Sequence, residues 1–318
     1  MLNLIDLMDK KYPTFNGVLL VDDDSILENQ KQTNDVFSKK WVAYDKEDDG
    51  EQKKFREFQK RWYLDLYGFE SEDALASFLK TKKVVLDAGC GLGYKANWFA
   101  ELSPDTLVLG MDYSDAAFAA SHKYKNVENL AFLKGDIANT HLIDGSVDYV
   151  SCDQVIHHTE NVSDTYAELT RILDLDGELA VYVYAKKALP RELIDDYFRS
   201  ATKNISDKAM LDFSAQLTEL GKNLSELNIE VEVPDIPVLG IKGGRYDIQR
   251  FIYWNFLKCF WNEELGKATS NATNYDWYAP SNATRYSKAE FLQFAKENEL
   301  ETVYLHSEEA AHSGRFRK

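Results

Sequence analysis

Short apolar runs and amphipathic stretches alternate along residues 84–186 of the chain. The apolar runs are rich in Val, Leu and Tyr, as in strands that are buried on both faces, and the stretches between them have a helical period. This alternation predicts parallel β–α–β units and a doubly wound α/β sheet. The predicted strands are 84–89, 106–113, 130–136, 147–153 and 179–186, and the helices between them are 93–102, 115–124 and 162–173.

The alternation stops after the fifth predicted strand. Residues 187–285 contain helical segments and an aromatic-rich stretch, and the α/β pattern returns only with a predicted helix at 287–299 and a strand at 301–307. An insertion at this point emerges at the carboxyl edge of the sheet, where open α/β folds bind ligands. We therefore interpret it as a mainly helical lid. The predicted domains are an N-terminal helical extension or cap (1–78), an α/β core (79–186 plus 286–318) and the lid (187–285).

The N-terminal part is more polar. Residues 45–54 form a charge run, which we interpret as solvated, and 53–68 form a predicted helix whose aromatic face covers a core. The net charge of -16 disfavours nucleic acid as a partner. No apolar run approaches the length of about 20 residues that crosses a membrane. Three cysteines without metal spacing fit a reducing compartment, so we expect a cytoplasmic protein.

A glycine-rich turn follows the first predicted strand, in VVLDAGCGLGYKANWFAE (84–101). Such a turn can cradle the phosphates of a dinucleotide, hold the methionine end of S-adenosylmethionine, or simply connect a strand to a helix. The dinucleotide interpretation has support, because Gly91, Gly93 and Ala96 satisfy the permissive fingerprint. Asp112 also lies 21 residues after Gly91, where such folds place an acidic residue.

Acidic residues at four successive strand ends favour a different ligand. Asp87 lies just before the turn, Asp112, Asp136 and Asp153 follow at intervals of 25, 24 and 17 residues, and a polar stretch, CDQVIHH, begins beside the last of them. Dinucleotide folds need no buried charge at the position of Asp87. Because the carboxyl ends of parallel strands share one edge, these groups are expected to face one crevice.

As a set, these motifs resemble the class I S-adenosylmethionine-dependent methyltransferases. DAGCGLG (87–93) is similar to their first motif, and MDYS (111–114), KGDI (134–137) and SCDQVIHHTEN (151–161) are similar to their later motifs, with SCDQVIHHTEN as in small-molecule enzymes that have a His-His pair. LTRILDLDGELAVYVY (169–184) resembles their fifth strand, with Asp176 as a departure. The resemblance covers about 80–186 and 286–318. It implies a doubly wound, mostly parallel Rossmann-like methyltransferase sheet with S-adenosyl-L-methionine as the cofactor.

The resemblance also implies residue roles. The turn glycines would let the backbone approach the methionine portion, Asp87 would help to hold the amino end, and Asp112 would accept both ribose hydroxyls. Asp136 would meet the adenine amine, with the Ile137 backbone beside the ring. For each acid the alternative is a helix cap or a turn. The implied cofactor-binding set is Asp87, Gly89, Cys90, Gly91, Gly93, Asp112, Tyr113, Asp136, Ile137, Asp153 and Gln154.

The candidate catalytic residues are His157 and His158, just past the fourth strand. A hydroxyl or carbon acceptor needs a general base, and histidine titrates in the useful range. The alternative, of equal weight, is that one histidine packs on the cofactor and the other caps a helix. A metal site is not expected, since adjacent histidines rarely chelate one ion.

The sequence therefore predicts an enzyme that methylates an O, N or C nucleophile of a small-molecule or sugar-like acceptor. The rivals are an NAD(P)-dependent oxidoreductase, for which no acid–base pair placed for hydride transfer is found, and a non-catalytic methyltransferase-like partner subunit. Neither nucleic acid nor a membrane is an expected partner, and a homodimer is compatible with the sequence.

Overall fold

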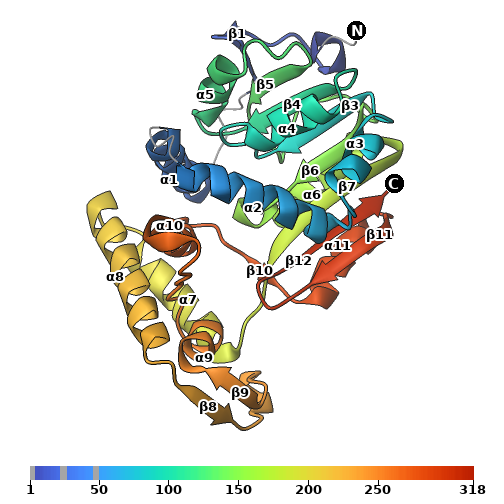
Figure 1. Cartoon of the computed structure of the whole chain (residues 1–318). Helices are drawn as coiled ribbons and strands as arrows, with labels where there is room; N and C mark the ends of the chain where they lie inside the picture. Colours follow the sequence, from blue (N-terminus) through green and yellow to red (C-terminus); the bar gives the residue numbers. More distant parts are fainter. Residues whose placement is uncertain (1–3, 22–26, 46–49) are drawn as a thin grey trace. The chain divides into compact units, whose positions relative to one another are not determined.

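The computed structural model describes residues 4–21, 27–45 and 50–318 (Figure 1). The chain forms two compact units: unit 1 comprises residues 1–185 and 284–318, and unit 2 comprises 186–283. The predicted N-terminal extension is thus part of unit 1 rather than a separate body. Part of the predicted charge run at 45–54 lies outside the described residues.

Unit 1 is built on one large sheet, whose strand order is β1-β2-β5-β4-β3-β6-β7-β12-β11, with β10 paired to β7. The middle strands run parallel and are buried, as their continuous apolar sequences require. The strands are β1 Thr14–Phe15, β2 Val18–Leu20, β3 Val84–Ala88, β4 Leu107–Asp112, β5 Leu130–Lys134, β6 Val147–Cys152, β7 Leu173–Ala185, β10 Arg285–Tyr286, β11 Glu301–Ser307 and β12 Ala311–Arg317.

The order of the sheet reverses at β3, which pairs with β4 on one side and with β6 on the other. The crevice outside the carboxyl ends of strands at such a reversal is the ligand-binding position of open α/β sheets. The doubly wound, mostly parallel sheet that the sequence predicts is therefore confirmed. It positions the glycine turn and the segment after β6 at the same edge.

Two features of the sheet differ from the sequence prediction. An N-terminal hairpin, β1–β2, extends the sheet because β2 pairs in parallel with β5. Strand β7 begins at Leu173 rather than at residue 179, where the predicted strand starts. Asp176 has a φ of 63°, and the register against β6 is irregular there, so the strand contains a bulge before the predicted segment.

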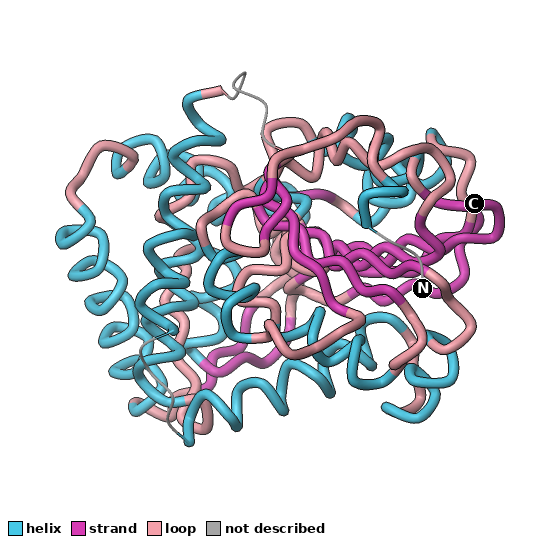
Figure 2. The backbone as a smooth tube through the Cα atoms, turned by 90° about the horizontal axis from the view of Figure 1, so that it is seen from above, coloured by secondary structure: helices cyan, strands magenta, loops and turns pink. Residues whose placement is uncertain are grey.

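Helices cover both faces of the sheet, as Figure 2 shows around the magenta strands. One face packs against α2 to α5 through residues such as Leu66, Leu79 and Phe99. The other packs against α6 and α11 through Tyr166, Leu169 and others. The helices of unit 1 are η1 Leu4–Leu7, α1 Glu28–Asp45, α2 Gly50–Tyr67, α3 Glu72–Leu79, α4 Tyr94–Leu102, α5 Ala116–Lys123, η2 Ile156–His158, α6 Val162–Arg171 and α11 Lys288–Glu297.

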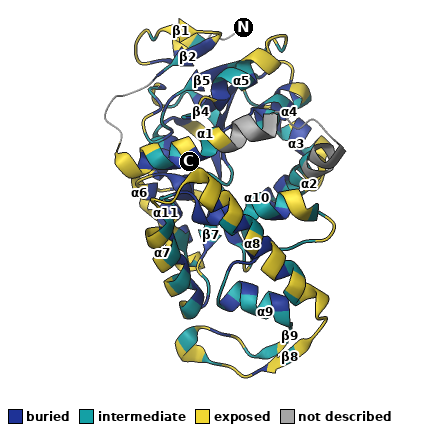
Figure 3. Ribbon diagram, turned by 90° about the vertical axis from the view of Figure 1, so that its left-hand side faces the viewer, coloured by how far each residue is buried: buried dark blue, intermediate teal, exposed yellow. Residues whose placement is uncertain are grey.

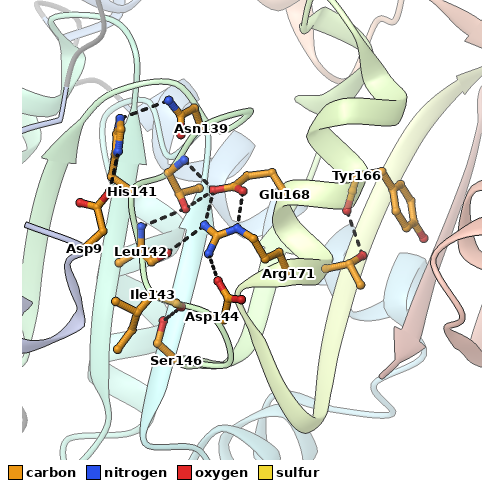
Figure 4. Close-up of polar contacts among 12 residues, drawn as sticks. Asp9, Asn139, His141, Leu142, Ile143, Asp144, Ser146, Tyr166, Glu168 and Arg171 are labelled. Atoms are coloured by element: carbon orange, nitrogen blue, oxygen red, sulfur yellow. Dashed lines mark hydrogen bonds and ion pairs between the residues drawn. The ribbon is translucent and has the colours of Figure 1, made fainter.

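The connection between β5 and β6 is tied to helix α6 (Figure 4). Glu168 accepts hydrogen bonds from the backbone N–H and the hydroxyl of Thr140, at 2.8 and 2.6 Å. Arg171 donates to Glu168 at 2.7 Å and to the Leu142 carbonyl at 2.8 Å, and it pairs with Asp144. This network holds the segment that begins at the end of β5 and so helps to place its first residues at the sheet edge.

Unit 2 is mainly helical. Its helices are α7 Leu189–Thr202, α8 Asp207–Glu226, η3 Pro237–Leu239, α9 Ile248–Asn255 and α10 Gly266–Tyr278, and its two-stranded antiparallel sheet consists of β8 Glu230–Val233 and β9 Gly244–Asp247. The unit leaves unit 1 at the end of β7 and returns at β10, where Arg285 and Tyr286 pair with Tyr184 and Ala185. The two ends of the insertion thus join neighbouring strands.

Candidate active site

The glycine turn between β3 and α4 rests on the end of β4. The backbone N–H groups of Gly89 and Cys90 donate to the Met111 carbonyl at 2.8 and 3.0 Å. Gly89, Gly91 and Gly93 have φ values of 78°, 52° and 72°, a backbone conformation that residues other than glycine rarely adopt. The three glycines are therefore needed for the backbone path of the turn itself.

Gly89 is also required by a close approach within the protein. A Cβ atom at this position would lie 2.4 Å from Val155 Cγ2, on the segment that follows β6. The sequence prediction explained the glycines by the approach of a cofactor. At Gly89 the structure adds a second cause, because the turn packs directly against the segment that carries the histidine pair.

Asp112 ends β4 and holds the turn in place. Its Oδ2 accepts the Gly91 N–H at 2.7 Å, and its Oδ1 accepts the N–H and hydroxyl of Ser114 at 2.8 and 2.6 Å. Burial raises the pKa of this carboxyl, against the lowering effect of its hydrogen bonds from Ser114 and Gly91. Since each carboxylate oxygen accepts about two bonds, Oδ2 keeps one acceptor position for a ligand hydroxyl.

Asp136 occupies a turn after β5. Its Oδ1 accepts the Ala138 N–H at 2.8 Å, and its carbonyl accepts the Asn139 N–H at 3.0 Å. These are contacts of a turn acid, which is the alternative that the sequence left open. Ile137 beside it is buried, at 5% exposure.

Asp87 lies at the end of β3 with its side chain fully buried. It shares the sheet face of Val85, which packs against the helices α2 to α5, and Lys95 in the first turn of α4 reaches it there. Lys95 Nζ lies 3.3 Å from Asp87 Oδ1 and 3.2 Å from Asp153 Oδ2. Neither oxygen of Asp87 has a hydrogen-bond partner among the described residues. Burial raises the pKa of Asp87 to about 6, although Lys95 acts to lower it.

The N-terminal helix α2 reaches this cluster. Tyr67 donates a hydrogen bond to Asp153 Oδ1 at 2.8 Å, and Tyr63, one turn earlier, donates to Ser151 at 3.1 Å. Burial raises the pKa of both phenols well above 10, so they remain protonated donors. Sequence reasoning missed Lys95 and Tyr67. The position of Lys95, two residues after the last turn glycine, was the one local signal for its role.

The residues after β6 complete the edge of the crevice. Gln154 has a φ of 63°, a conformation that costs a residue other than glycine about 1–2 kcal/mol and that recurs at functional sites. Its side-chain amide lies 3.5 Å from Asp153 Oδ2. Tyr113 and Cys90 also lie at this edge, Tyr113 half-buried and Cys90 buried as a free thiol.

His157 is completely buried in the short helix η2. Its Nδ1 lies 3.3 Å from the Tyr182 carbonyl, which can only accept, so the proton of the neutral ring is on Nδ1. Its Nε2 has no hydrogen-bond partner among the described residues. The ring packs 3.9 Å from that of Tyr184, and burial lowers the pKa of His157 well below its usual range, with a further contribution from His158.

His158 has different surroundings. Its ring packs edge-on against Phe37 at 4.9 Å and against Tyr184 at 5.6 Å. The carbonyl of His157 accepts the N–H and hydroxyl of Thr284, which anchors the return of the chain beside the pair. The rings of both histidines thus pack against Tyr184 at the end of β7. Whether His157 acts as a base stays a prediction.

Residues 86–181 match a family model described as a methyltransferase domain. This segment contains the glycine turn, all four strand-end acids and the histidine pair. The chain contains a class I S-adenosylmethionine-dependent methyltransferase domain. The resemblance inferred from the motifs is thereby confirmed, and the dinucleotide interpretation of the turn is set aside.

Curated relatives match this chain over part of its length. A probable S-adenosylmethionine-dependent methyltransferase of Mycolicibacterium smegmatis is 35% identical over 97 residues, which cover 30% of this chain and 36% of the relative. A malonyl-acyl-carrier-protein O-methyltransferase of Legionella pneumophila is 29% identical over 94 residues, covering 29% and 33%. Several relatives are covered over only 25% to 36% of their own length. A solved S-adenosylmethionine-dependent methyltransferase of Aquifex aeolicus aligns with 80% of this chain and 91% of its own, at 13% identity and a TM-score of 0.41.

The residues of the methyltransferase domain fit the cofactor of its class. A cationic amino group suits the buried, incompletely bonded carboxylate of Asp87, and a hydroxyl suits the remaining acceptor position of Asp112. Among the described residues, no group of three or more His, Cys, Asp or Glu side chains could hold a metal ion. Within residues 4–21, 27–45 and 50–318, no helix is long and apolar enough to cross a bilayer.

Proposed function

We propose that the chain transfers the methyl group of S-adenosylmethionine to an O, N or C nucleophile of a small-molecule or sugar-like acceptor in biosynthesis. The supporting observation is the buried carboxylate of Asp87, which lies beside the glycine turn with neither oxygen hydrogen-bonded among the described residues. Lys95, which is shared with Asp153, offsets only part of the cost of burying this charge, and a bound cationic amino group would offset more of it. The bound cofactor supplies a methyl group already activated as a sulfonium. The protein therefore has mainly to align the acceptor nucleophile with this methyl group and to exclude water.

In this proposal the strand ends hold the cofactor. Asp87 receives the amino group, with Lys95 and Asp153 fixing its orientation, and Asp112 receives a ribose hydroxyl through Oδ2. A second ribose bond to Oδ1 requires the Ser114 hydroxyl to rotate away, since that oxygen already accepts two donors. Asp136 and Ile137 line the adenine end, and Asp153 and Gln154 line the edge where the methyl group leaves.

We assign the general base to His157. The Nδ1 proton faces the Tyr182 carbonyl, which leaves the lone pair on Nε2 as the acceptor for a proton. Because the ring is neutral and buried, it is ready to accept a proton but forms the imidazolium reluctantly. We assign His158 to packing, against the rings of Phe37 and Tyr184.

We further propose that unit 2 contributes to acceptor binding. It is inserted between β7 and β10, at the carboxyl edge where such folds bind ligands. The three free, buried thiols, Cys90, Cys152 and Cys259, support a reducing, cytoplasmic location. A homodimer and the absence of nucleic-acid and membrane partners remain predictions.

Calorimetry with S-adenosylmethionine and with NADH tests the cofactor assignment. We expect S-adenosylmethionine to bind and Asp112→Ala to weaken this binding by about 1–3 kcal/mol, because a buried acceptor for the ribose is lost. The control is Asp115→Ala, which changes an exposed carboxylate three residues away. Tight NADH binding without S-adenosylmethionine binding would contradict the assignment in favour of the oxidoreductase, and binding of neither would contradict it in favour of a non-catalytic subunit.

A further inference from the structure

Helix α7 in unit 2 is amphipathic in the reverse sense. A surface helix of a globular unit normally buries its apolar stripe. Helix α7 has a buried side and an exposed side (Figure 3), and here the buried side is charged while the exposed side carries large apolar residues. The buried charged positions are Arg191, Asp195 and Arg199, exposed by 1%, 0% and 9%. The exposed apolar positions are Leu189, Leu193 and Tyr197, at 47%, 63% and 71%.

The single carboxylate of this buried stripe already accepts three hydrogen bonds. Asp195 accepts Arg191 Nε at 2.7 Å, Trp277 Nε1 at 2.8 Å and the Tyr278 hydroxyl at 2.8 Å. Arg191 also donates to the Tyr253 carbonyl. Asp195 therefore neutralises Arg191, and a second buried cation near it has no carboxylate of its own in this stripe.

Lys258 brings a further cation into the same interior. It is 7% exposed, and no Asp or Glu carboxylate among the described residues lies within ion-pair distance of it. Its Nζ lies 4.2 Å from the centre of the Trp277 ring and 5.9 Å from that of Tyr253. Burial above all, with repulsion from Arg191 and Lys187, lowers the pKa of Lys258 well below its usual range, although Asp195 and, more weakly, Asp276 attract it from beyond ion-pair distance.

The segment that carries Lys258 is held firmly although it is not helical. The Cys259 carbonyl accepts the Gln249 side chain at 2.9 Å, and the Phe260 N–H donates to the Asn274 side chain at 2.8 Å. Gly221 on α8 admits this segment, because a Cβ there would lie 2.2 Å from the Cys259 carbonyl oxygen. Polar side chains from two helices thus fix the backbone that places an unpaired lysine inside the unit.

We propose that Lys258 and Arg191, with the rings of Trp277 and Tyr253, form a binding site for an oxyanion, a carboxylate or phosphate group carried by a small organic molecule. An anion supplies the charge that the interior lacks, since desolvated cations are costly without a partner. The aromatic rings suit an apolar, planar body attached to the anion. This site lies within unit 2 and does not depend on the methyl-transfer assignment.

The test is to titrate the full chain with sulfate and with benzoate at constant ionic strength, following tryptophan fluorescence. We expect a saturable change with at least one anion. Lys258→Met should weaken binding by about 10- to 100-fold, because a charge-assisted contact is lost. The matched control is Lys208→Met, which removes the same charge from an exposed lysine on α8.

Calorimetry in two buffers of different ionisation enthalpy gives a second readout. Binding of benzoate should be accompanied by proton uptake in the wild type, because the anion favours the charged form of Lys258, and not in Lys258→Met. Preference for sulfate identifies a phosphate-type ligand and preference for benzoate a carboxylate. The proposal is overturned if neither anion binds saturably, or if the two lysine variants weaken binding equally. Unchanged melting curves show that the variants are folded, and S-adenosylmethionine binding, measured separately, tests the proposed enzyme activity independently.

Discussion

At the residue scale, the ionisation of Asp87 links the candidate cofactor site to stability. Its folded pKa of about 6 lies above its ordinary value of 3.8, so the folded state favours the protonated acid. The resulting stabilisation is complete below the unfolded pKa and is lost as the pH rises through about 6. Near neutral pH the protein therefore carries a poorly solvated carboxylate that a ligand can bind.

Asp87→Asn should remove this pH dependence. As the pH rises from about 4 to about 8, the wild type should lose about 2–3 kcal/mol of its free energy of unfolding relative to the variant. Urea denaturation across this range measures the difference. Asp105→Asn, at an exposed position, is the control and should follow the wild type. Asp87→Asn should also lose affinity for S-adenosylmethionine. Parallel curves of stability against pH for Asp87→Asn and the wild type would refute the burial argument.

His157 gives a second prediction at this scale. Because burial lowers its pKa, the acidic limb of the rate–pH profile should lie below pH 6.5 rather than at it. His157→Ala should reduce turnover by about 10²–10⁴-fold with cofactor affinity nearly unchanged. His158→Ala should act mostly through stability, since its ring packs on Phe37. Wild-type turnover in folded His157→Ala would point instead to an amine acceptor, for which positioning is sufficient.

At the scale of elements, the glycine turn and the segment after β6 must fit together. Gly89→Ala should destabilise the protein by about 2–4 kcal/mol, because it combines a positive φ with a Cβ 2.4 Å from Val155. Gly145→Ala is the matched control: its φ is 66°, but the nearest atom to its Cβ lies 3.9 Å away, so only about 1–2 kcal/mol is expected.

A double-mutant cycle separates the two causes at Gly89. Val155→Ala removes the clashing methyl groups, so the Gly89→Ala/Val155→Ala protein should be more stable than the sum of the single changes predicts. Thermal denaturation of the four proteins measures the coupling. Strict additivity would mean that backbone strain alone accounts for the glycine.

At the scale of the whole molecule, unit 1 and unit 2 are expected to respond to different ligands. S-adenosylmethionine should slow hydrogen exchange at the strand ends of unit 1, since it binds the folded state there. An acceptor added afterwards should slow exchange within 233–250 and 268–284, which belong to unit 2 except for the last residue. Hydrogen exchange with mass spectrometry resolves these segments. Unchanged exchange in unit 2 with a verified acceptor would assign the insertion a structural or assembly role.

The sequence by itself determined the α/β class, the positions of the middle strands along the chain and the cofactor class. These features depend on signals between near neighbours: an apolar run that becomes a strand, a glycine that permits positive φ, and an acid at a strand end. Even the burial of Asp87 could be predicted, because it precedes the turn within an apolar run.

Only the tertiary structure decided which groups those acids meet. Lys95 joins Asp87 to Asp153, and Tyr67 reaches Asp153 from a helix 86 residues earlier in the chain. The bulge in β7, the hairpin beside β5 and the charged interior around Arg191 likewise left no local pattern that could be recognised. Such features arise from the packing of distant segments, and a periodic pattern specifies which face of an element is buried but not which side chains it is buried against.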